Sequence, residues 1–157
     1  MERRNFIKTA LLGSIAAAMN IKREKANAAE GTFKDEKNDL VAVMGGTPST
    51  MYKRAITEMG GMRKYIKKGD KVVIKPNIGW DKSPEFAADT NPQLIGAIVR
   101  DCIAAGAAEV IVFDHTCDSD WKSCYKRSGI EDETIKAGGT MASANDEKYY
   151  RDTDIPQ

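Results

Sequence analysis

The sequence predicts an α/β protein, a Rossmann-like three-layer sandwich built on a mostly parallel sheet of about four strands. Two observations lead to this prediction: short β-rich runs alternate with longer helical segments, and the runs are almost continuously apolar. Alternation of this kind is typical of βαβ units. Continuous apolar runs are typical of parallel strands that are covered on both faces.

Each element has its own signal in the sequence. Four runs have the composition of strands: residues 40–44, 71–75, 109–113 and 140–144. Four segments have the periodicity or the capping residues of helices: residues 48–59, 92–105, 119–127 and 131–137. Thr47 is a suitable N-cap, Pro48 suits a first helical position, and Gly106 ends the clearest amphipathic helix. Residues 77–90 lack periodicity, so we expect a long loop, which in compact domains is usually functional or disordered.

The first 28 residues indicate an export signal. Arg3 and Arg4 precede Phe6 and Lys8, after which come a mildly apolar, alanine-rich run and the small-residue sequence Ala-Asn-Ala. This order is typical of a twin-arginine signal peptide, which would carry the protein through the twin-arginine export machinery to the periplasm. An ordinary secretory signal and an amphipathic surface helix are the alternatives.

We expect four parts along the chain: a signal peptide over residues 1–28, a polar tether over 29–38, the α/β domain over 39–145 and a polar tail over 146–157. After residue 28 the chain keeps 18 of its 24 basic and 21 of its 23 acidic residues, a formal charge of −3. A mildly acidic domain lacks the basic surface that nucleic-acid binding requires. No later stretch is apolar over the roughly 18 residues that span a bilayer, so we expect no stable membrane anchor after cleavage.

Polar clusters follow three of the expected strands. They are Gly45-Gly46-Thr47, Lys75-Pro76-Asn77 and Asp114-His115-Thr116-Cys117. Ligands of parallel α/β sheets bind at the carboxyl ends of the strands, so these clusters predict a binding site. If the strands lie side by side, the three clusters share one pocket.

The first two clusters each have a functional and a structural interpretation. Gly45, Gly46 and Thr47 open a helix, where free N–H groups favour an anion, but such residues also form ordinary capped turns. Lys75 follows an apolar run, so it is partly desolvated and suited to neutralise an anion, with Asn77 to orient the ligand. Alternatively, Lys75 only extends its ammonium group to water.

His115, Cys117 and Cys124 are candidate metal ligands. Imidazole and thiolate donors suit a transition metal, but their spacing matches no established finger or cluster motif. Cys117 and Cys124 are also a candidate disulfide pair in an oxidising compartment, although seven helical residues span ~10 Å, beyond the reach of a disulfide. Two free thiols are the third alternative. Cys102 lies in an apolar helical stripe and is expected in the core.

The expected loop over residues 77–90 contains two aromatic residues, Trp80 and Phe86, among acidic ones. Such a loop forms either a lid or a surface for a partner protein. Packing of the loop onto its own domain is an equal alternative.

Several motifs occur in an order that resembles a known family. They are GDKVVIKPNIGWD at residues 69–81, TNP at 90–92, AGA at 105–107, FDHTC at 113–117, CY at 124–125, SGI at 128–130 and GG at 138–139. Together they resemble the family called domain of unknown function 362 over residues 40–144. The resemblance implies a longer parent protein and an iron–sulfur association, because some members carry ferredoxin-type segments. This chain has no C-x-x-C motif and ends at Gln157, so we expect a fragment or a homologue without the second half.

We therefore expect an exported α/β protein of unassigned activity that binds a small anionic ligand at the strand ends. Lys75 would be the charge partner, Asn77 the orienting group, residues 45–47 the anion cradle, and Asp114 part of the opposite wall. Redox chemistry is expected only through the family association, and the cofactor is unknown. Two alternatives stay open: an accessory module that docks to a redox partner protein through the Trp80 loop, and a fragment that needs an absent C-terminal half.

Overall fold

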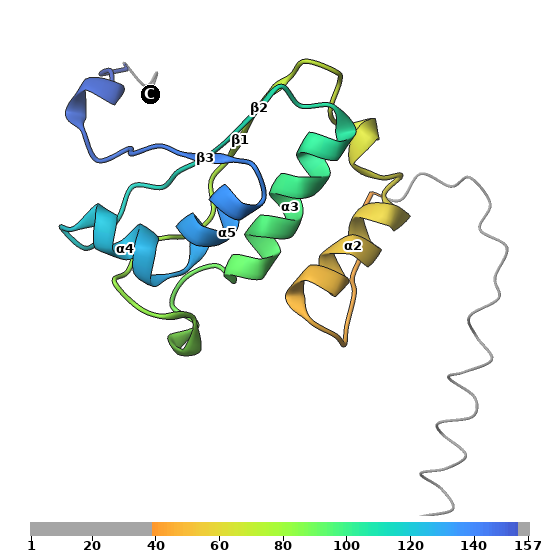
Figure 1. Ribbon diagram of the computed structural model, residues 1–157, viewed down its shortest axis with the longest axis horizontal. Coiled ribbons are helices and arrows are strands. Elements are labelled where there is room, and N and C mark those ends of the chain that lie inside the picture. The colour runs from red at the N-terminus through yellow and green to blue at the C-terminus, as the bar shows by residue number, and fades with distance from the viewer. Residues whose placement is uncertain (1–38, 154–157) are drawn as a thin grey trace, which may run out of the picture. The chain divides into compact units, whose positions relative to one another are not determined.

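A computed structural model describes residues 39–153 of the chain. Within that range the chain forms a mixed α/β domain with a three-stranded parallel sheet and four α-helices. The strands are β1 (Lys71–Ile74), β2 (Glu109–Val112) and β3 (Thr140–Met141). The α-helices are α2 (Pro48–Glu58), α3 (Pro92–Ala105), α4 (Trp121–Arg127) and α5 (Ile130–Lys136). Short 3₁₀ helices are η1 (Met62–Lys64), η2 (Pro84–Phe86) and η3 (Glu147–Tyr149). Figure 1 shows how these elements are arranged.

The sheet brings the carboxyl ends of its strands to one edge. Its order is β1-β2-β3, and both neighbouring pairs are parallel. Ile74 at the end of β1 is the register partner of Val112 at the end of β2. The ladder continues past the strands, because Phe113 donates its N–H to the Ile74 carbonyl at 3.2 Å and Ala142 donates to the Val112 carbonyl at 3.0 Å. Side chains just beyond each strand therefore meet along this edge.

One face of the sheet packs against helices. Ile74, Val110 and Val112 point to this face and join a core that includes Val99 of α3 and Ile130 of α5. Figure 1 shows α3 and α5 on the same side of the strands, and these two helices also contact each other. The strand residues that alternate with this core point to the opposite face.

The ends of α3 follow the signals in the sequence. Asn91 caps its first turn, since its Oδ1 accepts the Leu94 N–H at 3.0 Å. Gly106 ends it with φ 118°, a left-handed conformation that a Cβ would oppose, because that atom would lie 3.2 Å from the Lys68 Cα. Cys102 is buried in this helix, as expected. Of the helices that the structure describes, none is both long and apolar enough to cross a membrane.

The opposite face of the sheet is open in the described part of the chain. Val73 is 58% exposed, and Ile111 and Phe113 are only half-buried. The expected three-layer arrangement requires a second helical layer over these residues. Among residues 39–153, the helices α3 and α5 cover the other face.

The expected strand at residues 40–44 is not formed. Leu40 is 86% and Met44 is 95% exposed, and no backbone hydrogen bond among the described residues joins this run to β1. An apolar run makes a stable strand only where a neighbour satisfies its backbone groups and covers its side chains. Composition alone predicted the run, and composition does not report whether such a neighbour exists.

Candidate functional site

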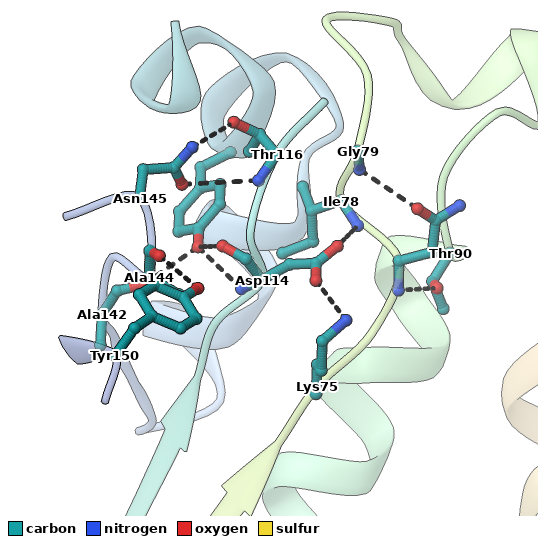
Figure 2. A network of polar contacts seen from close by, with 12 residues as sticks. Lys75, Ile78, Gly79, Thr90, Asp114, Thr116, Ala142, Ala144, Asn145 and Tyr150 are labelled. Atoms are coloured by element: carbon teal, nitrogen blue, oxygen red, sulfur yellow. Dashed lines mark hydrogen bonds and ion pairs between the residues drawn. The ribbon is translucent and has the colours of Figure 1, made fainter. Parts of the chain in front are cut away.

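A network of polar contacts lies at the carboxyl ends of β1 and β2 (Figure 2). Lys75 directly follows β1, and Asp114 follows β2 by two residues. The Lys75 ammonium group donates a hydrogen bond to Asp114 Oδ1 and forms an ion pair with it. The sheet therefore brings together the second and third of the polar clusters that the sequence contains.

Asp114 is the centre of this network. Its side chain is only 6% exposed. Its Oδ2 accepts the backbone N–H of Ile78 at 2.8 Å, while Oδ1 faces Lys75. A buried charge is tolerated when it is both paired and hydrogen-bonded, and Asp114 meets both conditions. The sequence analysis expects Asp114 in the wall of a ligand pocket; in the structure its carboxylate is buried and paired with Lys75.

Tyr125 of α4 is hydrogen-bonded to the backbone of Asp114. Its hydroxyl oxygen accepts the Asp114 N–H at 2.8 Å. The hydroxyl also donates toward two carbonyl oxygens, that of Asp114 at 2.6 Å and that of Ala142 at 3.0 Å. The side chain is almost fully buried, and this burial raises the pKa of the Tyr125 hydroxyl. One hydroxyl thus joins α4 to the ends of β2 and β3.

Asn77 closes the loop that follows β1. Its Nδ2 donates to the Ala88 carbonyl at 2.9 Å, and its Oδ1 accepts the Gly79 N–H at 3.2 Å. Its N–H donates to Thr90 Oγ1 at 3.0 Å, and Thr90 donates its own N–H to the Asn77 carbonyl at 2.9 Å. Residues 77–90 therefore form an Ω-like loop with joined ends. The Asn77 amide is used in this closure rather than held free for a ligand.

The loop is fastened to the segment after β2. The Gly79 carbonyl accepts the N–H groups of Cys117 at 2.9 Å and Asp118 at 3.1 Å. Asp81 donates its N–H to Asp118 Oδ2 at 2.7 Å, and its Oδ1 accepts the Ser123 hydroxyl at 2.8 Å. These hydrogen bonds join the loops after β1 and β2 into one rim at the carboxyl ends of the two strands.

The end of β3 contributes a third part that the sequence analysis missed. Asn145 donates from Nδ2 to Thr116 Oγ1 at 2.9 Å and accepts the Thr116 N–H at 3.4 Å. Thr116 in turn donates its hydroxyl to the Asp118 carbonyl at 2.7 Å. Asn145 follows an expected strand, so the strand-end rule that selected Lys75 and Asp114 also applied to it.

The first polar cluster lies elsewhere. Thr47 caps α2, since its Oγ1 accepts the Thr50 N–H at 3.3 Å, and Gly45 and Gly46 form the turn before it. α2 packs against α3, and no hydrogen bond in the described residues joins residues 45–47 to Asp114. The structure thus gives this cluster the role of an ordinary capped turn.

His115, Cys117 and Cys124 do not form a common ligand set. His115 is exposed beside Tyr150, with ring centroids 6.0 Å apart, while Cys117 is exposed and Cys124 is buried. Both thiols are free, and burial raises the pKa of the Cys124 thiol. Residues 39–153 contain no group of three His, Cys, Asp or Glu side chains that could hold a metal ion. Those residues therefore fit neither a metal site nor an iron–sulfur cluster.

The aromatic side chains of the loop face solvent. Trp80 is 45% and Phe86 is 65% exposed, and the Lys82 ammonium group lies 5.8 Å from the centre of the Phe86 ring. The backbone of Ala87 has φ 50°, a left-handed conformation that is uncommon for a residue with a Cβ. The loop thus has hydrogen-bonded ends and exposes two aromatic side chains between them.

Asp89 lies at the base of the same loop. Its Oδ1 accepts the Trp80 N–H at 3.2 Å, while its buried Oδ2 has no hydrogen-bond partner among the described residues. Burial raises the pKa of Asp89 above its ordinary 3.8, and the charges of Asp114 and Asp118 raise it further, against the lowering effect of the backbone hydrogen bonds.

We expect Asp89 to stabilise the protein as the pH falls. Because its pKa is higher in the folded chain than in the unfolded chain, folding favours the protonated carboxyl, and this contribution is lost as the pH rises through the folded pKa. The unfolding free energy of the native protein minus that of Asp89→Asn should increase between about pH 7 and about pH 4. Urea unfolding at each pH measures this difference in unfolding free energy, and Asp152→Asn, at an exposed position, is the control. A free-energy difference that stays constant or decreases as the pH falls contradicts the expectation.

One comparison with known proteins gives a match. A family model described as a domain of unknown function (DUF362) matches residues 72–157, a range that contains all three strands' carboxyl ends and the network around Asp114. No curated protein and no solved structure matches the chain. Because the family match spans more than half of the sequence, the chain belongs to the DUF362 family.

Proposed function

We propose that this protein binds a small anionic ligand at the carboxyl ends of β1 and β2, with Lys75 as the charge partner. The observation that carries this proposal is that Lys75 is anchored by buried Asp114 while its own side chain stays 62% exposed. An ammonium group has three N–H donors, so two remain for a ligand. The position of the charge is fixed before the ligand arrives, which lowers the cost of binding.

The carboxylates around Lys75 do not oppose an anion as strongly as their number suggests. Asp114 is paired with Lys75 itself, and Asp81 lies 3.6 Å from the Arg127 guanidinium. Asp89 accepts the Trp80 N–H, and burial raises its pKa above the ordinary value. Asn77 has an indirect part in this proposal, because it holds the loop that borders the site.

Replacing Lys75 tests the proposal. We expect Lys75→Gln to bind inorganic phosphate, citrate or acetate about tenfold more weakly than the native protein, since the charge that attracts the anion is removed. Lys71→Gln is the matched control, because Lys71 begins the same strand, is 77% exposed and pairs with Glu109 at 3.0 Å. Isothermal titration calorimetry measures the affinities, and circular dichroism checks that both variants are folded. Equal affinities in the two variants would remove Lys75 from the site.

We also propose that the protein is exported to the periplasm by the twin-arginine machinery. The signal that suggests this lies in residues 1–28, outside the described residues. Its support is the register of the two arginines with Phe6 and Lys8.

Exchange of the arginine pair tests the route. With Arg3→Lys and Arg4→Lys together, we expect the periplasmic share of the protein to fall about tenfold, because that pathway depends on the arginine pair itself and not on its charge. Cell fractionation and immunoblotting measure the share. Lys22→Gln with Arg23→Gln is the control, and export that persists in the Arg3 and Arg4 variant refutes the route.

A second candidate function is that of a non-catalytic module that docks to a redox partner protein. The exposure of Trp80 and Phe86 at the tip of a fastened loop favours it, because exposed aromatic side chains are frequent in protein interfaces. This function does not exclude the first, since the loop tip and Lys75 are separate parts of the rim.

We further infer that the sheet is the centre of a Rossmann-like fold, although the run at residues 40–44 that precedes it is not paired with β1 in the described structure. α2 supports this inference. It connects that run to β1 and packs against α3, as the crossover helix of a βαβ unit does.

A further inference from the structure

An apolar groove of about 430 Å³ lies on the open face of the sheet. Its floor consists of Val73, Ile111 and Phe113 from the strands, and its wall consists of Tyr149 and Tyr150 at the end of η3. Pockets that bind small ligands have volumes of about 300–1,000 Å³, so the groove is large enough for one. An apolar hollow of this size on a surface generally marks a binding site.

The groove lies next to the carboxyl ends of the strands, where Lys75 follows β1, although Lys75 does not itself line the groove. Side chains of an extended strand alternate between its two faces, so Val73 and Lys75 share the open face. The extended pairing holds to this point, because Ile74 still accepts the Phe113 N–H at 3.2 Å. Two residues of a strand span ~6.6 Å, so a ligand that lies over Val73 has only a short distance to extend toward Lys75, whose ammonium group stays paired with Asp114. Figure 2 shows Lys75 at the end of β1 and Tyr150 beside Ala144, in the segment after β3, with Asp114 between them in this view.

A second basic side chain lies at this end of the groove. His115 continues the alternation of Ile111 and Phe113 along its own strand, and its ring stands edge-on to Tyr150, 6.0 Å between centroids. Beyond the apolar lining of the groove, the carboxyl ends of β1 and β2 thus carry two nitrogen-bearing side chains, Lys75 and His115. The charge that complements such an end is negative.

The geometry points to an amphipathic carboxylate as the ligand, with its apolar body in the groove and its carboxylate at Lys75. This inference rests on the proposed function, because it names the class of anion that Lys75 holds. A fully polar anion would leave the apolar floor in water. A neutral apolar molecule would leave the Lys75 ammonium group unused. Only a molecule with both parts uses the whole surface.

Comparing octanoate, acetate and octanol separates the contribution of the apolar body of the ligand from that of its carboxylate. We expect octanoate to bind the full chain at least about tenfold more tightly than acetate, because its methylene groups leave water, and more tightly than octanol, which lacks the charge. Val73→Ser should weaken octanoate about threefold or more and leave acetate unchanged. Ile135→Ser is the matched control: Ile135 is 59% exposed, close to the 58% of Val73, but lies on α5. Calorimetry measures all affinities.

The outcomes distinguish this inference from the proposed function. If acetate binding depends on Lys75 but octanoate gains nothing over acetate, the inference is wrong and the anion site stands. Octanol that binds as tightly as octanoate, or equal losses in Val73→Ser and Ile135→Ser, also overturns the inference. If Lys75→Gln binds acetate as tightly as the native protein, the proposed function fails and the inference fails with it.

Discussion

The buried carboxylate of Asp114 is the interaction on which the rest of this structure depends. It accepts hydrogen bonds from Lys75 after β1 and from the Ile78 N–H at the start of the loop, while its own backbone is bonded to Tyr125 of α4. A carboxylate so deeply buried is stable only if all of these partners stay in place. The strand ends, the loop and the helix therefore hold one another in a single arrangement.

This arrangement determines what the surface presents. The loop over residues 77–90 is joined at its ends and hydrogen-bonded to the segment after β2, so several contacts hold the rim beside the strand ends in place. Lys75 is held on its inner side and exposed on its outer side. Because the helices cover one face of the sheet, the other face supplies an apolar surface next to this charge. Rigid donors and a water-accessible apolar floor are the ordinary components of a ligand site.

Local sequence signals identify some residues of the network, and contacts between residues far apart in the sequence explain the others. Lys75 and Asp114 were found from the sequence because both follow apolar runs, and parallel strands end at one edge. Tyr125 was missed, because its hydroxyl is bonded to backbone atoms of a strand end 11 residues away, and no side-chain pattern records this. The sequence suggests that Asn77 orients a ligand, whereas in the structure its amide closes a loop. Residues 40–44 have the composition of a strand without a neighbour to pair with.

Amide hydrogen exchange in the native protein and in Asp114→Ala tests the central role of Asp114 most directly. If its carboxylate fastens the loop, the Ile78 amide loses at least about tenfold more protection in the variant than the Val99 amide in the core of α3, because only the former loses its acceptor. Nuclear magnetic resonance resolves the two amides. An equal loss at Ile78 and Val99, or no loss at Ile78, would contradict the account.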